Sequence, residues 1–203
     1  MTKKPTYDLE YKLKNERYKC IIGIDEAGRG GLLGPVVAAG VIISNGFDTS
    51  DINDSKKLSA KKREYLYGKI TSACTYSVHA ISAEIIDQVN ILEATKMAMK
   101  LVVADVRNEV DFVLVDGNFL IPNINIDQKA VVNGDNISVS IAAASIIAKV
   151  TRDRMMLDLH KLYPIYGLDK HKGYGTKFHR DAIKLYGPCE YHRKTYKGVK
   201  EYL

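Results

Sequence analysis

Short apolar runs rich in β-branched residues recur along the chain and predict five β-strands. The fourth run is apolar at nearly every position, which is typical of a strand that is buried on both faces. Both the first and the fourth run end in an acid, Asp25 and Asp116 respectively. The predicted strands span 19–25, 36–43, 76–82, 111–116 and 128–132.

Longer segments between these runs predict helices, and several carry start and stop signals. Ser59 is a plausible N-cap, Asn90 marks a possible break in the second helical stretch, and Pro164 ends an Ala-rich segment. Residues 167–175 are rich in Gly and Lys and predict a loop. The expected helices span 59–74, 83–106, 138–163 and 177–186.

The alternation of strands and helices predicts an α/β layer architecture, and the proximity of the first two strands favours an antiparallel hairpin. Residues 1–18 are polar and predict a short amphipathic helix or a loose arm. We expect one α/β domain to span 19–165 and a small helical subdomain to follow over 166–203.

Charge is distributed unevenly along the 203 residues, although the composition is that of an ordinary globular chain, with 46% hydrophobic and 27% charged residues. Residues 149–203 hold 13 Lys and Arg against 6 Asp and Glu, a net of +7, whereas the remainder has a net charge of −1. This basic segment indicates an anionic partner, with nucleic acid ahead of a membrane surface or a small phosphorylated ligand. A solvated basic face without a partner is the alternative.

Several classes of protein are disfavoured. The start of the chain lacks the apolar stretch of a signal peptide, and the longest nearly apolar run, 139–150, is too short to cross a bilayer. Three widely spaced cysteines give neither a disulfide framework nor metal-binding spacing, and are typical of cytosolic thiols. We therefore expect a cytoplasmic protein with no membrane association, in which any metal is bound by oxygen ligands.

Acids at the ends of two strands are the candidate chemistry. If the strands that carry Asp25, Glu26 and Asp116 are neighbours, these carboxylates meet at one edge of the sheet. Clustered carboxylates repel one another unless one is protonated or a cation lies among them, and Mg²⁺ or Mn²⁺ takes oxygen ligands. Each acid alone is more often a turn or cap residue. For Asp135, just before a helix, that ordinary role is the expectation from spacing.

Glycines and basic residues supply candidate substrate contacts. The segment 28–34 has the spacing G-x-G-x-x-x-G and precedes a strand, so it does not fit a dinucleotide-binding loop, and no P-loop motif occurs. Its glycines favour close approach of the backbone to a sugar or phosphate, or simply a tight turn. Basic residues interleaved with tyrosine suit a phosphate backbone and stacking on a sugar, although each is individually more typical of a solvated surface. These basic and aromatic candidates are Lys56, Lys57, Lys149, Arg152, Lys172 and Tyr174.

Six segments together resemble the bacterial ribonuclease HII family, the type 2 ribonucleases H. They occur in the order of the family's motifs from about residue 20 to 200. Residues 1–18 are too few for the extra N-terminal domain of the related type 3 enzymes, so we expect type 2. The segments are 22–30 (IGIDEAGRG), 53–58 (NDSKKL), 115–118 (VDGN), 143–153 (AASIIAKVTRD), 171–174 (HKGY) and 191–194 (YHRK).

The resemblance implies a ribonuclease H-like three-layer fold with a mixed central sheet flanked by helices. It implies a monomeric endoribonuclease that hydrolyses the RNA strand of RNA–DNA hybrids and incises on the 5′ side of ribonucleotides embedded in duplex DNA. Two Mg²⁺ or Mn²⁺ ions would support this hydrolysis, which leaves 5′-phosphate and 3′-hydroxyl ends. The implied metal-site and catalytic acids are Asp25, Glu26, Asp116 and Asp135, so the resemblance replaces the turn role of Asp135.

The resemblance also assigns roles to the substrate contacts. Gly28, Arg29 and Gly30 would contact the 2′-hydroxyl, and Tyr174 would pack on the neighbouring deoxyribose. The basic residues singled out above would hold phosphates. Gly31, Leu33 and Asn133 depart from the family's pattern. Another ribonuclease H-like nuclease, such as a resolvase or integrase, and a non-catalytic hybrid-binding protein are the alternatives.

Overall fold

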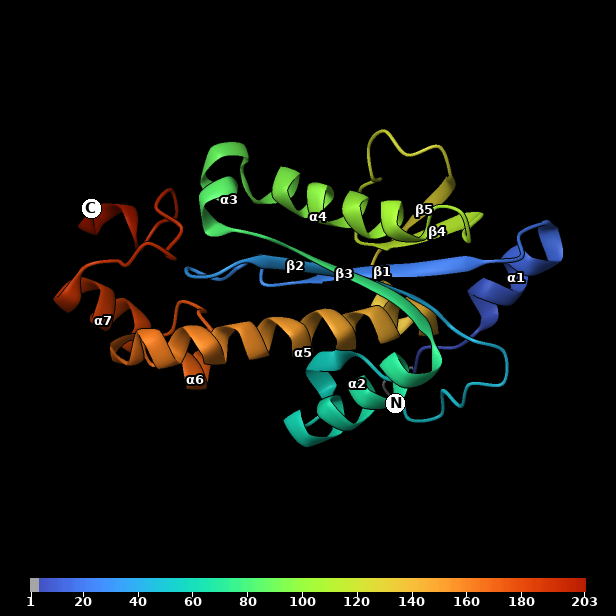
Figure 1. The fold of residues 1–203 in the computed structure, drawn as a ribbon, viewed down its shortest axis with the longest axis horizontal. Helices are drawn as coiled ribbons and strands as arrows, with labels where there is room; N and C mark the ends of the chain where they lie inside the picture. The colour runs from blue at the N-terminus through green and yellow to red at the C-terminus, as the bar shows by residue number, and fades with distance from the viewer. Residues whose placement is uncertain (1–3) are drawn as a thin grey trace.

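The computed structural model describes residues 4–203 and contains a mixed five-stranded sheet between two layers of helices (Figure 1). The strand order is β3-β2-β1-β4-β5, with antiparallel pairing among the first three strands and parallel pairing of β1 with β4 and of β4 with β5. The predicted α/β class and the β1–β2 hairpin are therefore confirmed. The strands are β1 (Ile21–Ala27), β2 (Val36–Ile42), β3 (Thr75–Ile81), β4 (Phe112–Asp116) and β5 (Asp127–Val131).

Helices α3 (Ala83–Val89) and α4 (Ile91–Val106) cover one face of the sheet, and α2 (Ala60–Ala73) and α5 (Val139–Leu162) cover the other (Figure 1). Alternate strand residues supply the two cores, with Ile22, Ile24 and Val113 packing under α4. Helix α5 lies against β1, where a Cβ on Gly23 would come within 2.3 Å of the α5 backbone. The helix that follows Asp135 is thus held directly on the strand that carries Asp25.

The predicted helix boundaries agree with the capping residues. Ser59 and Ser138 accept hydrogen bonds from backbone N–H groups in the first turns of α2 and α5. Asn90 has a φ of 72° and caps α4, so the expected break near this residue separates α3 from α4. Strand β1 runs two residues past its predicted end, because its pairing with β2 continues through Glu26 and Ala27.

The N-terminal segment forms α1 (Asp8–Glu16), which favours the helix over the loose arm, while residues 1–3 lie outside the described residues. Glu10 is buried, and its Oε1 accepts hydrogen bonds from the hydroxyls of Ser138 and Ser140 at 2.6 and 2.7 Å. The segment therefore anchors the start of α5.

Residues after α5 form a group of short helices around the C-terminal half of α5 (Figure 1). Their apolar side chains pack with Leu33 and Met156 in a separate small core. The loop predicted at 167–175 contains one helical turn. No helix within residues 4–203 has the length and apolar character needed to cross a membrane. The short elements are η3 (Pro164–Tyr166), α6 (Leu168–His171), α7 (Lys177–Tyr186) and η4 (Lys200–Tyr202).

Two histidines of this small core give it a predicted dependence on pH. His179 and His192 are almost fully buried, and burial lowers the pKa of both to about 4. In the unfolded chain each returns to about 6.5, so below that pH the unfolded state binds more protons. We expect the free energy of unfolding to fall as the pH drops from about 6.5 towards 4. Thermal melts followed by circular dichroism check this, and H192Q, which lacks one titrating imidazole, should lose less stability. An equal loss in both proteins would contradict it.

Candidate active site

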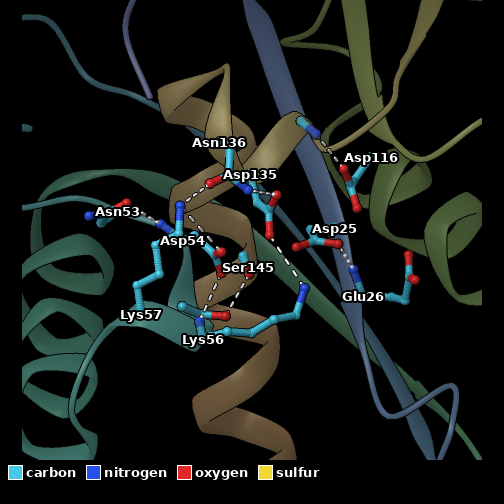
Figure 2. Close-up of polar contacts among 12 residues, drawn as sticks. Asp25, Glu26, Asn53, Asp54, Lys56, Lys57, Asp116, Asp135, Asn136 and Ser145 are labelled. Atoms are coloured by element: carbon cyan, nitrogen blue, oxygen red, sulfur yellow. Dashed lines mark hydrogen bonds and ion pairs between the residues drawn. The ribbon is translucent and has the colours of Figure 1, made fainter. Parts of the chain in front are cut away.

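Four acids reach one end of the sheet from three segments. Asp25 and Glu26 lie near the end of β1, and Asp116 ends the parallel neighbour β4, where Ile24 pairs with Val115. Asp135 lies in the 3₁₀ turn η2 (Gly134–Asn136), directly before α5. Figure 2 shows Asp25 between Asp135 and Asp116, with Glu26 beside it. The structure therefore brings together all four acids singled out from the sequence.

Burial and mutual repulsion make this cluster unfavourable when every acid is ionised. Asp25 is only 4% exposed, and burial, together with the charges of Glu26 and Asp116, raises its pKa well above the ordinary value. Burial also raises the pKa of Glu26, although Arg29 Nη1, 3.4 Å from its Oε1, opposes the shift. The pKa of Asp116 is raised by burial as well, against a 2.7 Å hydrogen bond from the Gly134 N–H.

Positive charge reaches the cluster from the 3₁₀ turn η1 (Ser55–Lys57). Lys56 Nζ lies 3.5 Å from Asp135 Oδ2 (Figure 2). Burial disfavours the lysine charge, yet the carboxylates of Asp135, Asp25 and Asp54 outweigh it and raise the pKa of Lys56. Asp54 accepts from the Lys56 N–H at 2.9 Å and thereby sets the turn. One lysine does not neutralise four carboxylates.

The donor set suits a hard divalent cation. All the donors are carboxylate oxygens, and Glu26 Oε2 is buried without a hydrogen-bond partner. A cation would supply the missing partner and relieve the repulsion at Asp25. Among residues 4–203, no group of three or more His, Cys, Asp or Glu side chains already has the spacing of a metal site.

A cleft of about 450 Å³ is lined by one of the four acids, Glu26, together with several of the predicted substrate contacts. Gly28 forms part of its wall with a φ of 99°, and a Cβ there would lie 2.0 Å from Arg152 Nε, so only glycine fits. Tyr174 is 36% exposed and lies on the loop after α6, where its Cε1 would be 3.9 Å from a Cβ on Gly30. The lining includes Glu26, Gly28, Arg29, Gly30, Lys56, Lys149 and Tyr174.

Two predicted phosphate contacts lie outside the lining of this cleft. Lys57 Nζ donates to Asn136 Oδ1 and lies 3.9 Å from Asp54 Oδ2. Lys172 has a φ of 51° and donates from Nζ to the Asp169 carbonyl oxygen. Both ammonium groups thus already have protein partners, and their role towards a substrate stays a prediction.

The prediction that Arg152 holds a phosphate is wrong. Its side chain is fully buried, and its guanidinium donates to the carbonyl oxygens of Pro35, Lys172 and Leu33 at 2.9, 2.8 and 3.0 Å. A phosphate cannot reach a group enclosed in this way. The i, i+3 spacing with Lys149 suggested a shared face, but α5 is covered by other segments on the side where Arg152 lies.

Arg193 is a second buried arginine with a related function, although residue type and spacing assigned it no role beyond its motif. Its guanidinium donates to the carbonyl oxygens of Gly28, Arg29 and Gly34 at distances from 2.7 to 3.1 Å. The two arginines therefore fix the segment 28–35 through its carbonyl groups. Ser145, which hydrogen-bonds Ser55 at 2.8 Å beside Asp25, was likewise missed, because a serine in an Ala-rich helix gives no signal.

Lys149 and Arg152 offer a matched comparison. We expect R152A to lower the free energy of unfolding by about 3 kcal/mol, because three buried carbonyls lose a charged donor. This loss corresponds to a fall of roughly 6–12 °C in Tm. K149A should instead reduce the slope of log Kd for duplex binding against log salt by about 1, with little change in Tm. Thermal melts and salt titrations of both variants check this. A large change of salt slope in R152A, at unchanged Tm, would restore the phosphate role.

Comparison with known proteins places nearly the whole chain in one family. The family model described as Ribonuclease HII matches residues 22–199. A ribonuclease HII of Geotalea uraniireducens is 50% identical over 197 residues, covering 97% of this chain and 91% of that protein. One of Chlamydia muridarum is 54% identical over 186 residues, covering 91% and 85% of the two chains.

Solved structures give the same result for the fold. The structure of a complex of PCNA and ribonuclease HII from Archaeoglobus fulgidus matches with a TM-score of 0.77 at 29% identity, covering 88% of this chain and 96% of that chain. Ribonuclease H2 from Pyrococcus horikoshii matches with a TM-score of 0.71 at 27% identity, covering 90% and 96%. The family model matches most of the chain, and the relatives are identical to it at about half of the aligned positions. Together with the four acids at one end of a ribonuclease H-like sheet, these matches show that the chain belongs to the ribonuclease HII family.

Proposed function

We propose that this endoribonuclease hydrolyses the RNA strand of RNA–DNA hybrids and cleaves on the 5′ side of ribonucleotides embedded in duplex DNA, in the cleft beside Asp25 and Glu26. The observation that carries the proposal is the shared cleft, in which Glu26, the glycines 28 and 30 and Tyr174 line one space. A carboxylate cluster and groups that reach a sugar therefore act on the same nucleotide.

The acids Asp25, Glu26, Asp116 and Asp135 would hold Mg²⁺ or Mn²⁺. Bound divalent ions supply Lewis-acid stabilisation of the charge that develops on the scissile phosphate and raise the acidity of the attacking water. The hydrogen bond from the Gly134 N–H keeps one Asp116 oxygen fixed. Lys56 stands beside Asp135, where it adds positive charge towards an incoming phosphate.

Substrate recognition is proposed to rest on the sugar and the backbone. The 2′-hydroxyl distinguishes RNA from DNA, so a selective site needs donors and acceptors directed at it. Gly28 and Gly30 line the cleft, and Arg29, Lys57, Lys149 and Lys172 supply charge for phosphates. We propose that the enzyme acts as a monomer and that residues 166–203 form a subdomain that contributes Tyr174.

A gel assay with end-labelled substrates tests the proposal. The substrates are an RNA–DNA hybrid, a DNA duplex with one ribonucleotide, an all-DNA duplex and a branched DNA junction, each with Mn²⁺, with Mg²⁺ and with chelator. We expect cleavage of the first two alone, dependent on metal, with 3′-hydroxyl ends. Cleavage of the junction would favour a resolvase, and binding of the hybrid without cleavage in either metal would favour a non-catalytic protein.

A further inference from the structure

Three imidazoles lie behind Tyr174 and belong to no part of the cleft lining. His179 and His192 are 0% and 1% exposed, and their Nε2 atoms are 3.2 Å apart. The His171 ring stacks on that of His179 with centroids 4.6 Å apart and an interplanar angle of 19°. The contact between the two Nε2 atoms is a hydrogen bond only if one of them carries a proton and the other does not.

Hydrogen bonds with the backbone determine where each proton lies. His192 Nδ1 accepts from the Cys189 N–H at 2.9 Å, so the proton of neutral His192 is on Nε2. That proton is directed at His179 Nε2, which must then be the acceptor. The proton of His179 is therefore on Nδ1, which donates to the Tyr174 carbonyl oxygen at 3.1 Å. Burial keeps both rings uncharged at neutral pH, because it lowers both pKa values to about 4.

His171 holds the residue next to Tyr174 in the same way. Its Nε2 donates to the Tyr166 carbonyl oxygen at 2.7 Å, and its Nδ1 accepts from the Gly173 N–H at 3.3 Å. The loop needs such support, since Lys172 and Gly173 both have left-handed backbones, with φ values of 51° and 82°. The Tyr174 ring leaves this loop towards the cleft, 5.7 Å from Lys149 Nζ.

We propose that His179, held by His192 as the Nδ1–H tautomer, is a positioning residue that fixes Tyr174 for contact with the substrate sugar. The inference rests on the function proposed above for Tyr174. It adds that substrate selection depends on a buried chain of hydrogen bonds from Cys189 through His192 and His179 to the Tyr174 carbonyl, although none of those three side chains meets the substrate.

Two substitutions at His179 distinguish the effect of its Nδ1–H donor from the effect of side-chain size. In H179N the amide nitrogen can take the place of Nδ1 and keep the bond to Tyr174, whereas in H179Q it lies nearer the position of Nε2 and loses that bond. We expect H179Q to lower kcat on a duplex with one ribonucleotide by about 10- to 100-fold, with KM and all-DNA duplex binding nearly unchanged. H179N should keep most of the activity. Equal kcat in the two variants, whether both high or both low, would overturn the proposal.

The tautomers provide a test that is independent of activity. Long-range ¹H–¹⁵N spectra of the full chain should show His179 protonated on Nδ1 and His192 on Nε2, and a proton on His179 Nε2 would overturn the proposal even if H179Q fails to fold. The kcat of Y174A is the reference against which the kcat of H179Q is compared. If Y174A cleaves normally, the role proposed for Tyr174 in function fails, and the spectra alone then decide whether the hydrogen-bond chain exists.

Discussion

D116N should cleave about 10³-fold or more slowly than the unsubstituted protein, while it continues to bind duplex. Asp116 is one of the four clustered acids, and the amide can still accept the 2.7 Å hydrogen bond from the Gly134 N–H, so the fold around it should survive. The variant loses a charged oxygen ligand for the divalent ion, which supplies several kcal/mol of transition-state stabilisation. Single-turnover cleavage and binding titrations with the same ribonucleotide-containing duplex measure the two effects.

A matched control for D116N is D105N. Asp105 is an exposed acid of α4 that bonds Ser77 and His79, both on β3. It carries the same charge but contributes nothing to the cluster, so D105N should cleave at the normal rate. Near-normal turnover of D116N would remove this residue from the catalytic set. A parallel loss of duplex binding would instead assign it to substrate contact.

Y174A should reduce cleavage at a single embedded ribonucleotide by about 10- to 100-fold and weaken hybrid binding far less. The ring is exposed in the cleft and can pack on a sugar, and contacts of this kind contribute about 1–3 kcal/mol. A long hybrid retains many backbone contacts, so its binding depends less on one ring. Cleavage rates and Kd values for both substrates measure the difference.

Y174F refines this result, because it keeps the ring and removes only the hydroxyl. If the ring provides packing alone, Y174F should cleave like the unsubstituted protein. If the hydroxyl also contacts the 2′-hydroxyl, Y174F should lose part of the activity of a single-ribonucleotide site. Equal losses of cleavage and hybrid binding in Y174A would identify the tyrosine as a structural residue.

The fold was predictable where local patterns and long-range pairing agree. The apolar runs around Ile22 and Val113 specify buried strands. The structure confirms the helix starts expected at Ser59 and Ser138 and the break expected near Asn90. The strand order and the parallel pairing of β1 with β4 were not specified locally, because they depend on how α4 and α5 pack on opposite faces. The meeting of Asp25 with Asp116 therefore had to stay conditional.

Asp135 and Arg152 show where reading residue types stops being sufficient. Spacing alone assigns Asp135 to an ordinary turn, and only the resemblance placed it with the acids, where the structure also has it. Arg152 has the charge of a phosphate ligand, but its surroundings make it a donor to three buried carbonyls. Burial of a long side chain depends on segments that are distant in sequence, such as 33–35 and 172, and residue type does not reveal it.

The hydrogen bonds from Arg193 to the carbonyls of Gly28, Arg29 and Gly34 affect when the cleft can form during synthesis. The guanidinium that closes this segment comes 159 to 165 residues later in the chain than the carbonyls that it binds. On the ribosome, those carbonyls therefore lack their donor until residue 193 has emerged. The cleft beside the acids takes its final shape only after that point in synthesis.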